Sequence, residues 1–385
     1  MSGPFYSVKE LLARLVSFDT TSHKTNLPLI RFVEDYLAQH GLASTLIFNE
    51  TRNKANLFAT IGPPDKAGIG LSGHTDVVPV TGQSWDTDPF RLHERDGRLY
   101  GRGTTDMKGY LACVLASVPM LKSRRLQKPI HILFSYDEEI GCTGVRPMIA
   151  GFDRSIVKPE MVFVGEPTRM TVVDAHKGPV RWEVEVRGRA VHSSMAPYGV
   201  NAVAYAGQLL GELAKIESHL AETSRDDRFD PPYSTLQVTM ISGGTASNIV
   251  PVTCNFGFEV RALPGLEIAA IEQRIRDYAN QCMMPMQSVA KEAGISIRQT
   301  NQVPPFSVDP KSPIVALALE LAGSDQTFAV SYATEAGLFQ DAGAPSVVCG
   351  PGDIVQAHTA NEWIEVSELD RCMAFFARLA DRLAA

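Results

Sequence analysis

The sequence has no Cys-x-x-Cys pair, no basic cluster of the size that nucleic-acid binding needs, and no apolar run long enough to cross a membrane. Its six cysteines are widely scattered, which argues against a disulfide framework or a cysteine zinc site and favours reduced thiols in a cytoplasm. The net charge of -7 argues against nucleic acid or an anionic membrane as a partner. The N-terminus lacks a basic region followed by an apolar run, so we expect no signal peptide.

The Gly-x-Gly-x-x-Gly turn of dinucleotide-binding enzymes is also missing, because Gly101-Arg102-Gly103 has no third glycine at the required spacing. A cofactor-using oxidoreductase is therefore a weak alternative. What the chain does have is 385 residues, 44% of them hydrophobic and 21% charged. This length and composition are typical of a globular enzyme with two domains.

The first half of the chain alternates between strand and helix patterns. Strands are predicted at 55–61, 68–72, 129–135 and 161–164, and helices over much of 8–40 and from Asp106 to Leu121. This alternation predicts an α/β fold whose mostly parallel sheet has helices on both faces. Ligands bind at the carboxyl ends of the strands in such sheets.

The pattern changes after Gly178, where residues 180–186 alternate between apolar and polar as in a half-exposed strand. The order of predicted elements from there to about residue 300 is β-α-β-β-α-β, which is typical of a ferredoxin-like α+β domain. We therefore predict one domain, formed by residues 1–179 and 301–385, that is split by an inserted domain of residues 180–300.

Acidic residues and histidines lie at or near the ends of the predicted strands. The candidates are His74, Asp76, Asp106, Glu138, Glu139, Glu166 and His358. Imidazole and carboxylate both bind zinc, and two histidines with three carboxylates suit two zinc ions that share one bridging carboxylate. We assign His74 and Glu166 to one metal and Glu139 and His358 to the other, with Asp106 as the bridge. Cobalt or manganese could occupy the same ligands.

Two of the candidates receive other roles. Glu138 has no ligand role but is next to a ligand, so we predict that it is the general base. Asp76 is expected to accept a hydrogen bond from the far nitrogen of His74 and so to fix its tautomer. Each residue alone has a simpler interpretation, such as a helix N-cap for Asp106, but their joint occurrence at strand ends favours a metal site.

Two stretches carry a resemblance to a known family: Ser-Gly-His-Thr-Asp-Val-Val-Pro at 72–79 and Tyr-Gly-Arg-Gly-Thr-Thr-Asp-Met-Lys-Gly at 100–109. They resemble the signature segments of the zinc-dependent aminoacylase and carboxypeptidase family, and the resemblance extends from about Val8 to the C-terminus. The family's ligands and base fall on the residues assigned above. The resemblance implies a metal-binding α/β domain with an inserted lid used for dimerisation. It also implies a cis peptide after the bridging aspartate, here Asp106-Met107.

The resemblance assigns three residues of the inserted domain. His192 falls on a histidine that stabilises the oxyanion formed from the substrate's carbonyl oxygen during the reaction. In dimeric relatives, this histidine reaches the partner's active site. Asn248 falls on a substrate-contacting position, and Arg261 on an arginine that binds the substrate's α-carboxylate. Without the resemblance, a turn histidine, a loop asparagine and a surface arginine are the simpler interpretations.

Segments around Lys177, Glu335 and Gly352 resemble acetylornithine deacetylases more than succinyl-diaminopimelate desuccinylases, which usually lack the glutamate at position 335. We hypothesise that this carboxylate pairs with the side-chain ammonium of ornithine; a role at a helix N-terminus is the alternative. The resemblance implies a cytoplasmic homodimer that hydrolyses a small N-acyl amino acid. A desuccinylase, another deacylase, a carboxypeptidase and, in a different class, a non-catalytic binder remain as alternatives.

Overall fold

The computed structural model describes residues 5–384, so most of the N-terminal stretch on which the signal-peptide prediction depends lies outside the described residues. The chain divides into two compact units. The first unit contains the residues up to Ala175, Ser307–Phe328 and the residues from Thr334 onward, and the second contains His176–Phe306 and Ala329–Ala333. Between residues 5 and 384, no helix has both the length and the apolar character needed to cross a bilayer.

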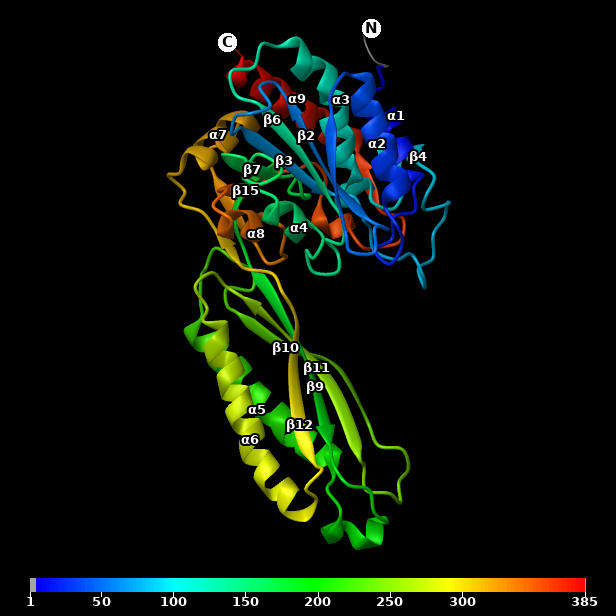
Figure 1. The fold of residues 1–385 in the computed structure, drawn as a ribbon, viewed down its shortest axis with the longest axis vertical. Helices are drawn as coiled ribbons and strands as arrows, with labels where there is room; N and C mark the ends of the chain where they lie inside the picture. Colours follow the sequence, from blue (N-terminus) through cyan, green and yellow to red (C-terminus); the bar gives the residue numbers. More distant parts are fainter. Residues whose placement is uncertain (1–4, 385) are drawn as a thin grey trace. The chain divides into compact units, whose positions relative to one another are not determined.

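A mixed sheet, nine-stranded in the described residues, forms the centre of the first unit (Figure 1). Its order is β1-β2-β6-β3-β7-β15-β8-β13, and β14 pairs with β8. The strands are β1 (Ser44–Phe48), β2 (Ala55–Ile61), β3 (Ile69–His74), β6 (Ile130–Ser135), β7 (Met161–Val164), β8 (Val172–His176), β13 (Phe306–Ser307), β14 (Thr327–Val330) and β15 (Ser346–Val348). The four central strands β6, β3, β7 and β15 are parallel to one another. The strands outside them pair in antiparallel fashion, β1 with β2, β2 with β6, and β8 with β15.

The predicted α/β class is confirmed, with the parallel pairs at the centre of the sheet. The segment that joins β1 to β2 covers only residues 49–54, which is too short for the crossover that parallel neighbours need. The edge of the sheet is therefore antiparallel. The parallel centre sets the position of the site, because four carboxyl ends meet at one edge.

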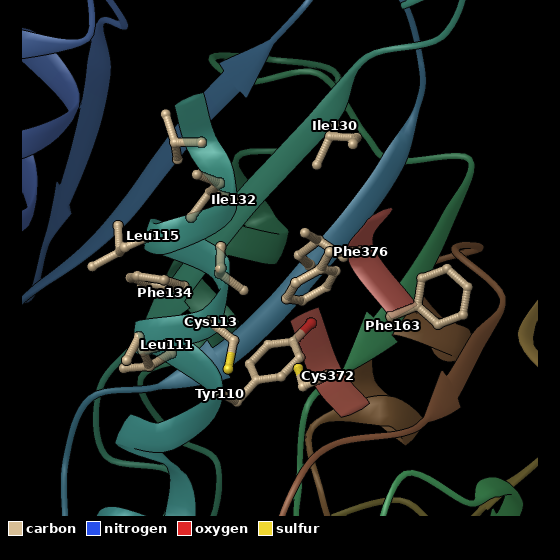
Figure 2. Close-up of a cluster of buried hydrophobic side chains, with 14 of the residues drawn as sticks. Tyr110, Leu111, Cys113, Leu115, Ile130, Ile132, Phe134, Phe163, Cys372 and Phe376 are labelled. Carbon is tan, nitrogen blue, oxygen red and sulfur yellow. The ribbon is translucent and has the colours of Figure 1, made fainter. Parts of the chain in front are cut away.

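Both faces of the central strands are buried. In β6, Ile130, Ile132 and Phe134 belong to the main core, whereas the intervening His131 and Leu133 are also buried but lie outside that core. Helices α1 (Val8–Val16), α2 (Leu27–Gln39), α3 (Gly109–Ser123), α7 (Pro313–Ala322) and α9 (Val366–Leu383) contribute to the main core, and α4 (Val145–Ala150) contacts α8 (Ala336–Asp341). Figure 2 shows side chains of α3 and α9 packed beside β6, among them Tyr110 and Phe376, whose ring centroids are 5.8 Å apart.

A small antiparallel sheet of β16 (Trp363–Glu365), β5 (Arg98–Tyr100) and β4 (His93–Arg95) also belongs to the first unit. Its register places Trp363 opposite Tyr100, and the main-chain N–H of Gly101 donates to the main-chain oxygen of Glu362 at 2.9 Å. This sheet therefore joins the segment before Asp106 to the segment after His358.

The second unit is a four-stranded antiparallel sheet of order β10-β11-β9-β12 with two long helices. The elements follow one another as β9 (Gly178–Arg187), α5 (Ala202–Thr223), β10 (Thr235–Gly243), β11 (Thr253–Ala262), α6 (Ile268–Val289) and β12 (Gly294–Gln302). In β9, Val180, Trp182 and Val184 are buried in the core of this unit, whereas Glu183 and Glu185 are exposed. This alternation leaves one charged face on the sheet, and the order of elements is the predicted β-α-β-β-α-β.

Candidate metal centre

The candidate ligands come from four neighbouring segments at the carboxyl edge of the parallel strands. His74 is the last residue of β3, and it pairs in register with Ser135, the last residue of β6. Glu139 follows β6 by four residues, and Glu166 follows β7 by two. His358 belongs to the loop that follows β15. Strand order alone therefore brings together residues that are far apart in the chain.

The fifth ligand, Asp106, lies before α3. The sequence predicted that a helix opens at this residue, but α3 begins at Gly109, and Asp106 has extended backbone angles (φ -122°, ψ 93°). The helix starts late because this conformation turns the aspartate toward the strand ends instead of leaving it in a helical turn. Asp106 is also not the N-cap, which is Lys108. The Asp106–Met107 peptide is cis, as the family resemblance implied.

The two imidazoles lie on either side of Asp106. His74 Nε2 is 3.0 Å from Asp106 Oδ1, and His358 Nε2 is 3.2 Å from Asp106 Oδ2. His74 Nε2 is also 3.5 Å from Glu166 Oε1, and His358 Nε2 is 2.9 Å from Glu139 Oε2. The structure thus brings all five assigned ligands together as two halves, each with one histidine and one glutamate, joined by the two oxygens of one aspartate.

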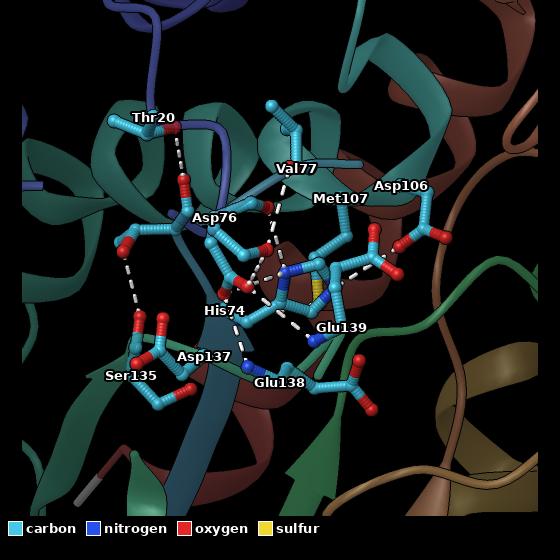
Figure 3. Close-up of polar contacts among 12 residues, drawn as sticks. Thr20, His74, Asp76, Val77, Asp106, Met107, Ser135, Asp137, Glu138 and Glu139 are labelled. Carbon is cyan, nitrogen blue, oxygen red and sulfur yellow. Dashed lines mark hydrogen bonds and ion pairs between the residues drawn. The ribbon is translucent and has the colours of Figure 1, made fainter. Parts of the chain in front are cut away.

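Figure 3 shows His74 in the middle of this cluster, with Asp76, Asp106 and Glu139 around it. Ligand atoms of His74, Asp106 and Glu139 lie within 4.8 Å of one another, and so do those of His74, Glu138 and Glu166. Glu139 Oε1 is buried and has no hydrogen-bond partner among the described residues. Because an unpaired buried carboxylate oxygen is costly, these residues fit a cation. Mixed imidazole and carboxylate ligands suit zinc or a similar transition metal.

The protonation of the cluster reflects its excess of buried carboxylates. Burial raises the pKa of Glu138 to about 8 and, together with the nearby Asp106, raises the pKa of Glu139 to about 7. Burial, again with Asp106, also raises the pKa of Glu166 well above its usual range. Hydrogen bonds with Asp106 and Glu139 raise the pKa of His358 to about 10. The metal-free protein therefore keeps protons on groups that a divalent cation would deprotonate.

The structure corrects the expected contact of Asp76. The atom nearest to His74 Nδ1 is the main-chain oxygen of Asp76, at 2.9 Å, and its carboxylate Oδ1 lies farther away, at 3.6 Å. The carboxylate is taken up by other donors, because it accepts the Ser22 hydroxyl at 2.7 Å and the main-chain N–H groups of Glu138 and Glu139 at 3.1 and 3.3 Å. Asp76 thus orients the imidazole mainly through its backbone and holds the Glu138–Glu139 segment through its side chain.

The structure does not support the hypothesis that Glu335 binds the substrate's ammonium group. Glu335 is 1% exposed, and its carboxylate accepts hydrogen bonds from Ser135 at 2.5 Å and Ser72 at 3.1 Å. Both carboxylate oxygens of Glu335 therefore already accept serine hydroxyls. The side chain is too deeply buried to meet the ammonium group of a substrate that enters from solvent. Glu335 does precede helix α8, as the alternative interpretation expected, but its side chain makes no capping hydrogen bond.

Cys142 is a residue of the site that the sequence did not single out. It is buried, and its thiol donates to Glu138 Oε1 at a sulfur–oxygen distance of 3.2 Å. The only signal in the sequence was its position four residues after Glu138. A cysteine in a loop is more often an ordinary buried residue, so that spacing alone could not identify it.

The three candidates of the second unit fall into two groups. His192 and Asn248 lie together, because the main-chain N–H of Ser193, the residue after His192, donates to the main-chain oxygen of Asn248 at 2.9 Å. Both are exposed. Arg261 is at the far end of β11, where it pairs in register with Pro179 and donates to Glu259 at 2.7 Å. The structure therefore does not bring Arg261 together with the other two within this unit.

Comparison with known proteins decides the family. The family model described as peptidase family M20/M25/M40 matches residues 70–382. The chain belongs to the M20/M25/M40 peptidase family. A protein of Myxococcus xanthus named acetylornithine deacetylase is 35% identical over 384 residues, which cover 98% of each chain. The resemblance predicted from the two signature stretches is confirmed.

Solved structures share the fold of this M20 chain. An M20 family metallo-carboxypeptidase from Sulfolobus solfataricus has a TM-score of 0.77 at 18% identity and covers 97% of this chain and 98% of its own. A dinuclear metal binding peptidase of the M20 family from Bacillus subtilis has a TM-score of 0.70 at 16% identity and covers 98% and 97%. The chain is thus an M20-family metallohydrolase that is similar to acetylornithine deacetylases.

Proposed function

We propose that this M20-family hydrolase cleaves the amide bond of an N-acyl amino acid, and that its substrate is N-acetyl-L-ornithine, which yields acetate and L-ornithine. The observation that carries the reaction type is the arrangement of two histidine–glutamate pairs on the two oxygens of Asp106. The name of the Myxococcus xanthus relative, which is 35% identical over 98% of the chain, supports the substrate.

Two divalent metal ions are the proposed cofactors, with zinc the first candidate and cobalt the second. His74 and Glu166 would hold one ion and His358 and Glu139 the other, while Asp106 would be shared. Bound there, the ions would polarise the scissile carbonyl and lower the pKa of water. The unpaired Glu139 Oε1 and the described dinuclear character of the Bacillus subtilis protein support this assignment.

Glu138 is the proposed general base. Its carboxylate lies beside the ligands but takes no part in the two histidine–glutamate pairs. It removes a proton from the attacking water and delivers that proton to the leaving nitrogen, a type of transfer that contributes about 10²–10⁴-fold to rates. Asp76 and Cys142 hold it in place through its main-chain N–H and its Oε1.

The second unit supplies the remaining proposed contacts. Arg261 binds the substrate's α-carboxylate with its N–H donors, in exchange for its present partner Glu259. Asn248 contacts the substrate. His192 donates to the carbonyl oxygen as negative charge develops on it, which is worth about 3 kcal/mol in comparable sites. We propose a homodimer in which His192 acts in the site of the partner subunit.

A substrate panel tests the proposal. Protein depleted of metal and reloaded with zinc or cobalt would be assayed on N-acetyl-ornithine, N-succinyl-diaminopimelate, N-acetyl-methionine and a dipeptide, by following free amine. We expect the highest kcat/KM for N-acetyl-ornithine and no turnover without metal. Faster cleavage of the succinyl compound would make the chain a desuccinylase. A metal-loaded protein that cleaves none of them would overturn the proposed deacylase activity.

A further inference from the structure

Glu362 has a carboxylate that is fully surrounded by donors. The residue lies four positions after His358 and is 1% exposed. Its Oε2 accepts the Arg102 guanidinium at 2.7 Å and the main-chain N–H of Gly103 at 3.0 Å. Its Oε1 accepts the main-chain N–H groups of Thr105 at 2.9 Å and Asp106 at 3.1 Å. One carboxylate therefore spans the whole turn that ends at the shared aspartate.

The contacts continue from Arg102 to the second histidine. Arg102, which is 1% exposed, donates from its other terminal nitrogen to Gln83 Oε1 at 2.5 Å. The amide nitrogen of Gln83 in turn donates to the main-chain oxygen of His358 at 2.7 Å. A continuous series of hydrogen bonds thus joins the backbone of Asp106 to the backbone of His358.

Neither end of this series has the regular backbone of a helix or strand, because Asp106 interrupts the short π-helical turn Thr104–Lys108 and His358 lies in a loop. Asp106 has extended angles, and His358 has a φ of 62°, a left-handed conformation that non-glycine residues rarely adopt. The imidazole of His358 is 51% exposed, so packing constrains it little. Because a buried Arg–Glu pair is by itself weak evidence for stability, the main-chain hydrogen bonds on these two loops are the better account of why Glu362 is there.

We propose that Glu362 is a positioning residue for the metal pair, which acts on Asp106 directly and on His358 through Arg102 and Gln83. This inference rests on the metal-binding part of the proposed function. Gln83 hydrogen-bonds the backbone of His358 and the side chain of Arg102, and reaches Asp106 only through Arg102 and Glu362, so its loss weakens mainly the metal site of His358. Glu362 contacts the turn of the shared aspartate, so its loss weakens both sites.

The first experiment compares Gln83→Ala with Ser84→Ala, an exposed neighbour. Metal-depleted wild type and variants would be titrated with Zn²⁺ by calorimetry and with Co²⁺ by absorbance. We expect two sites in the wild type and in Ser84→Ala. In Gln83→Ala, we expect one site of unchanged affinity and a second weakened about 10-fold, as for other residues that hold metal ligands. Two sites with wild-type affinities in Gln83→Ala would overturn the inference.

The second experiment compares Glu362→Gln with Glu365→Gln, whose side chain is on the surface near Arg98. We expect Glu362→Gln to bind both ions about 10–100-fold more weakly and Glu365→Gln to match the wild type. Thermal unfolding of the metal-free proteins shows whether Glu362→Gln is folded, so that weaker metal binding is not mistaken for unfolding. If Glu362→Gln does not fold, the titration of Gln83→Ala alone tests the inference. A wild type that binds no metal would overturn the proposed function as well, whereas unchanged variants beside a two-site wild type overturn only the positioning role.

Discussion

The carboxylate of Asp76 accepts the main-chain N–H of Glu138 at 3.1 Å, which ties the residue two positions after the first histidine to the proposed base. The Ser22 hydroxyl donates to the other oxygen of Asp76 at 2.7 Å and fixes the carboxylate in this orientation. One side chain thus controls where the segment after β6 leaves the sheet. The position of the base depends on it as much as on the strand itself.

Replacing Asp76 with alanine should therefore damage both metal binding and turnover. We expect metal affinity to fall about 10–100-fold, because the Glu139 main-chain N–H loses its partner, and kcat to fall further, because Glu138 shifts. Calorimetric titration and steady-state kinetics would measure the two effects separately. Ser22→Ala removes one hydrogen bond to the Asp76 carboxylate and should cost about 2 kcal/mol of stability with little change in metal affinity. Full activity in Asp76→Ala would refute this account.

The assignment of base and ligand to two consecutive glutamates makes a sharp prediction. Glu138→Gln should retain both metal ions but lose kcat by about 10²–10⁴-fold, because the amide cannot take up a proton. Glu139→Gln should instead lose one ion, because its carboxylate lies 2.9 Å from His358. Metal analysis of the purified variants beside their kcat values tests this. If the two variants exchange behaviour, the roles of the two residues are reversed.

The buried position of Glu335 changes what its removal should do. Its oxygens are held by Ser72 and Ser135, so we expect Glu335→Gln to reduce kcat/KM equally for acetylornithine and acetylmethionine. The ratio of the two kcat/KM values measures specificity independently of enzyme concentration. A selective loss on acetylornithine alone would restore the earlier hypothesis of contact with the substrate's ammonium group.

Long apolar runs made much of the fold predictable from the sequence. The bounds of β2 and β7 are the predicted ones, because each is a compact apolar segment with clear ends. The start of α3 was predicted wrongly, because local pattern favoured a helix at Asp106 and only the site demands extended backbone there. The strand ends indicated the candidate ligands for the same reason that they hold ligands in other α/β sheets.

Contacts that depend on burial were not predictable. Glu362 looked like one more acidic residue in a polar loop, and its four donors come from a segment more than 250 residues away. Cys142 likewise gained meaning only when its thiol met Glu138. No local property of the sequence separates such residues from ordinary surface carboxylates or core cysteines.

The fully buried His131 gives the metal-free protein a sensitivity to acid. Burial lowers the pKa of His131 to about 4, against 6.5 in an unfolded chain. The unfolded state therefore binds the proton first as the pH falls, so this stability is complete above pH 6.5 and is lost as the pH falls toward 4. The loss is up to about 3 kcal/mol. Urea unfolding would measure the free energy of unfolding at several pH values in this range. That free energy should depend less on pH in His131→Phe, which keeps the stacking on Phe58, than in the exposed control His93→Phe. An equal dependence on pH in both variants would contradict this role.

His192→Ala and Glu138→Ala, each inactive alone, should restore activity when the two chains are combined in one dimer. The reason is that Arg261 and His192 of one chain lie too far apart to contact the same substrate molecule. Arg261 lies near one end of β11, and Thr253 is the first residue at the other end. His192 lies beyond Thr253. Arg261 is eight residues after Thr253, which corresponds to about 26 Å at the usual rise of a strand, so Arg261 and His192 are at least this far apart. An N-acyl amino acid spans about 10 Å by ordinary bond lengths and cannot touch both residues of one chain.

If the partner subunit supplies His192, a dimer of one His192→Ala chain and one Glu138→Ala chain has one complete site. That site combines the intact Glu138 of the first chain with the intact His192 of the second. Random mixing puts half of the chains into such mixed dimers, so we expect about a quarter of the wild-type activity from two nearly inactive parents. The assay requires unfolding and refolding or co-expression, with each variant alone as its control. If the mixture stays as inactive as its parents, His192 acts within its own chain or has no part in catalysis.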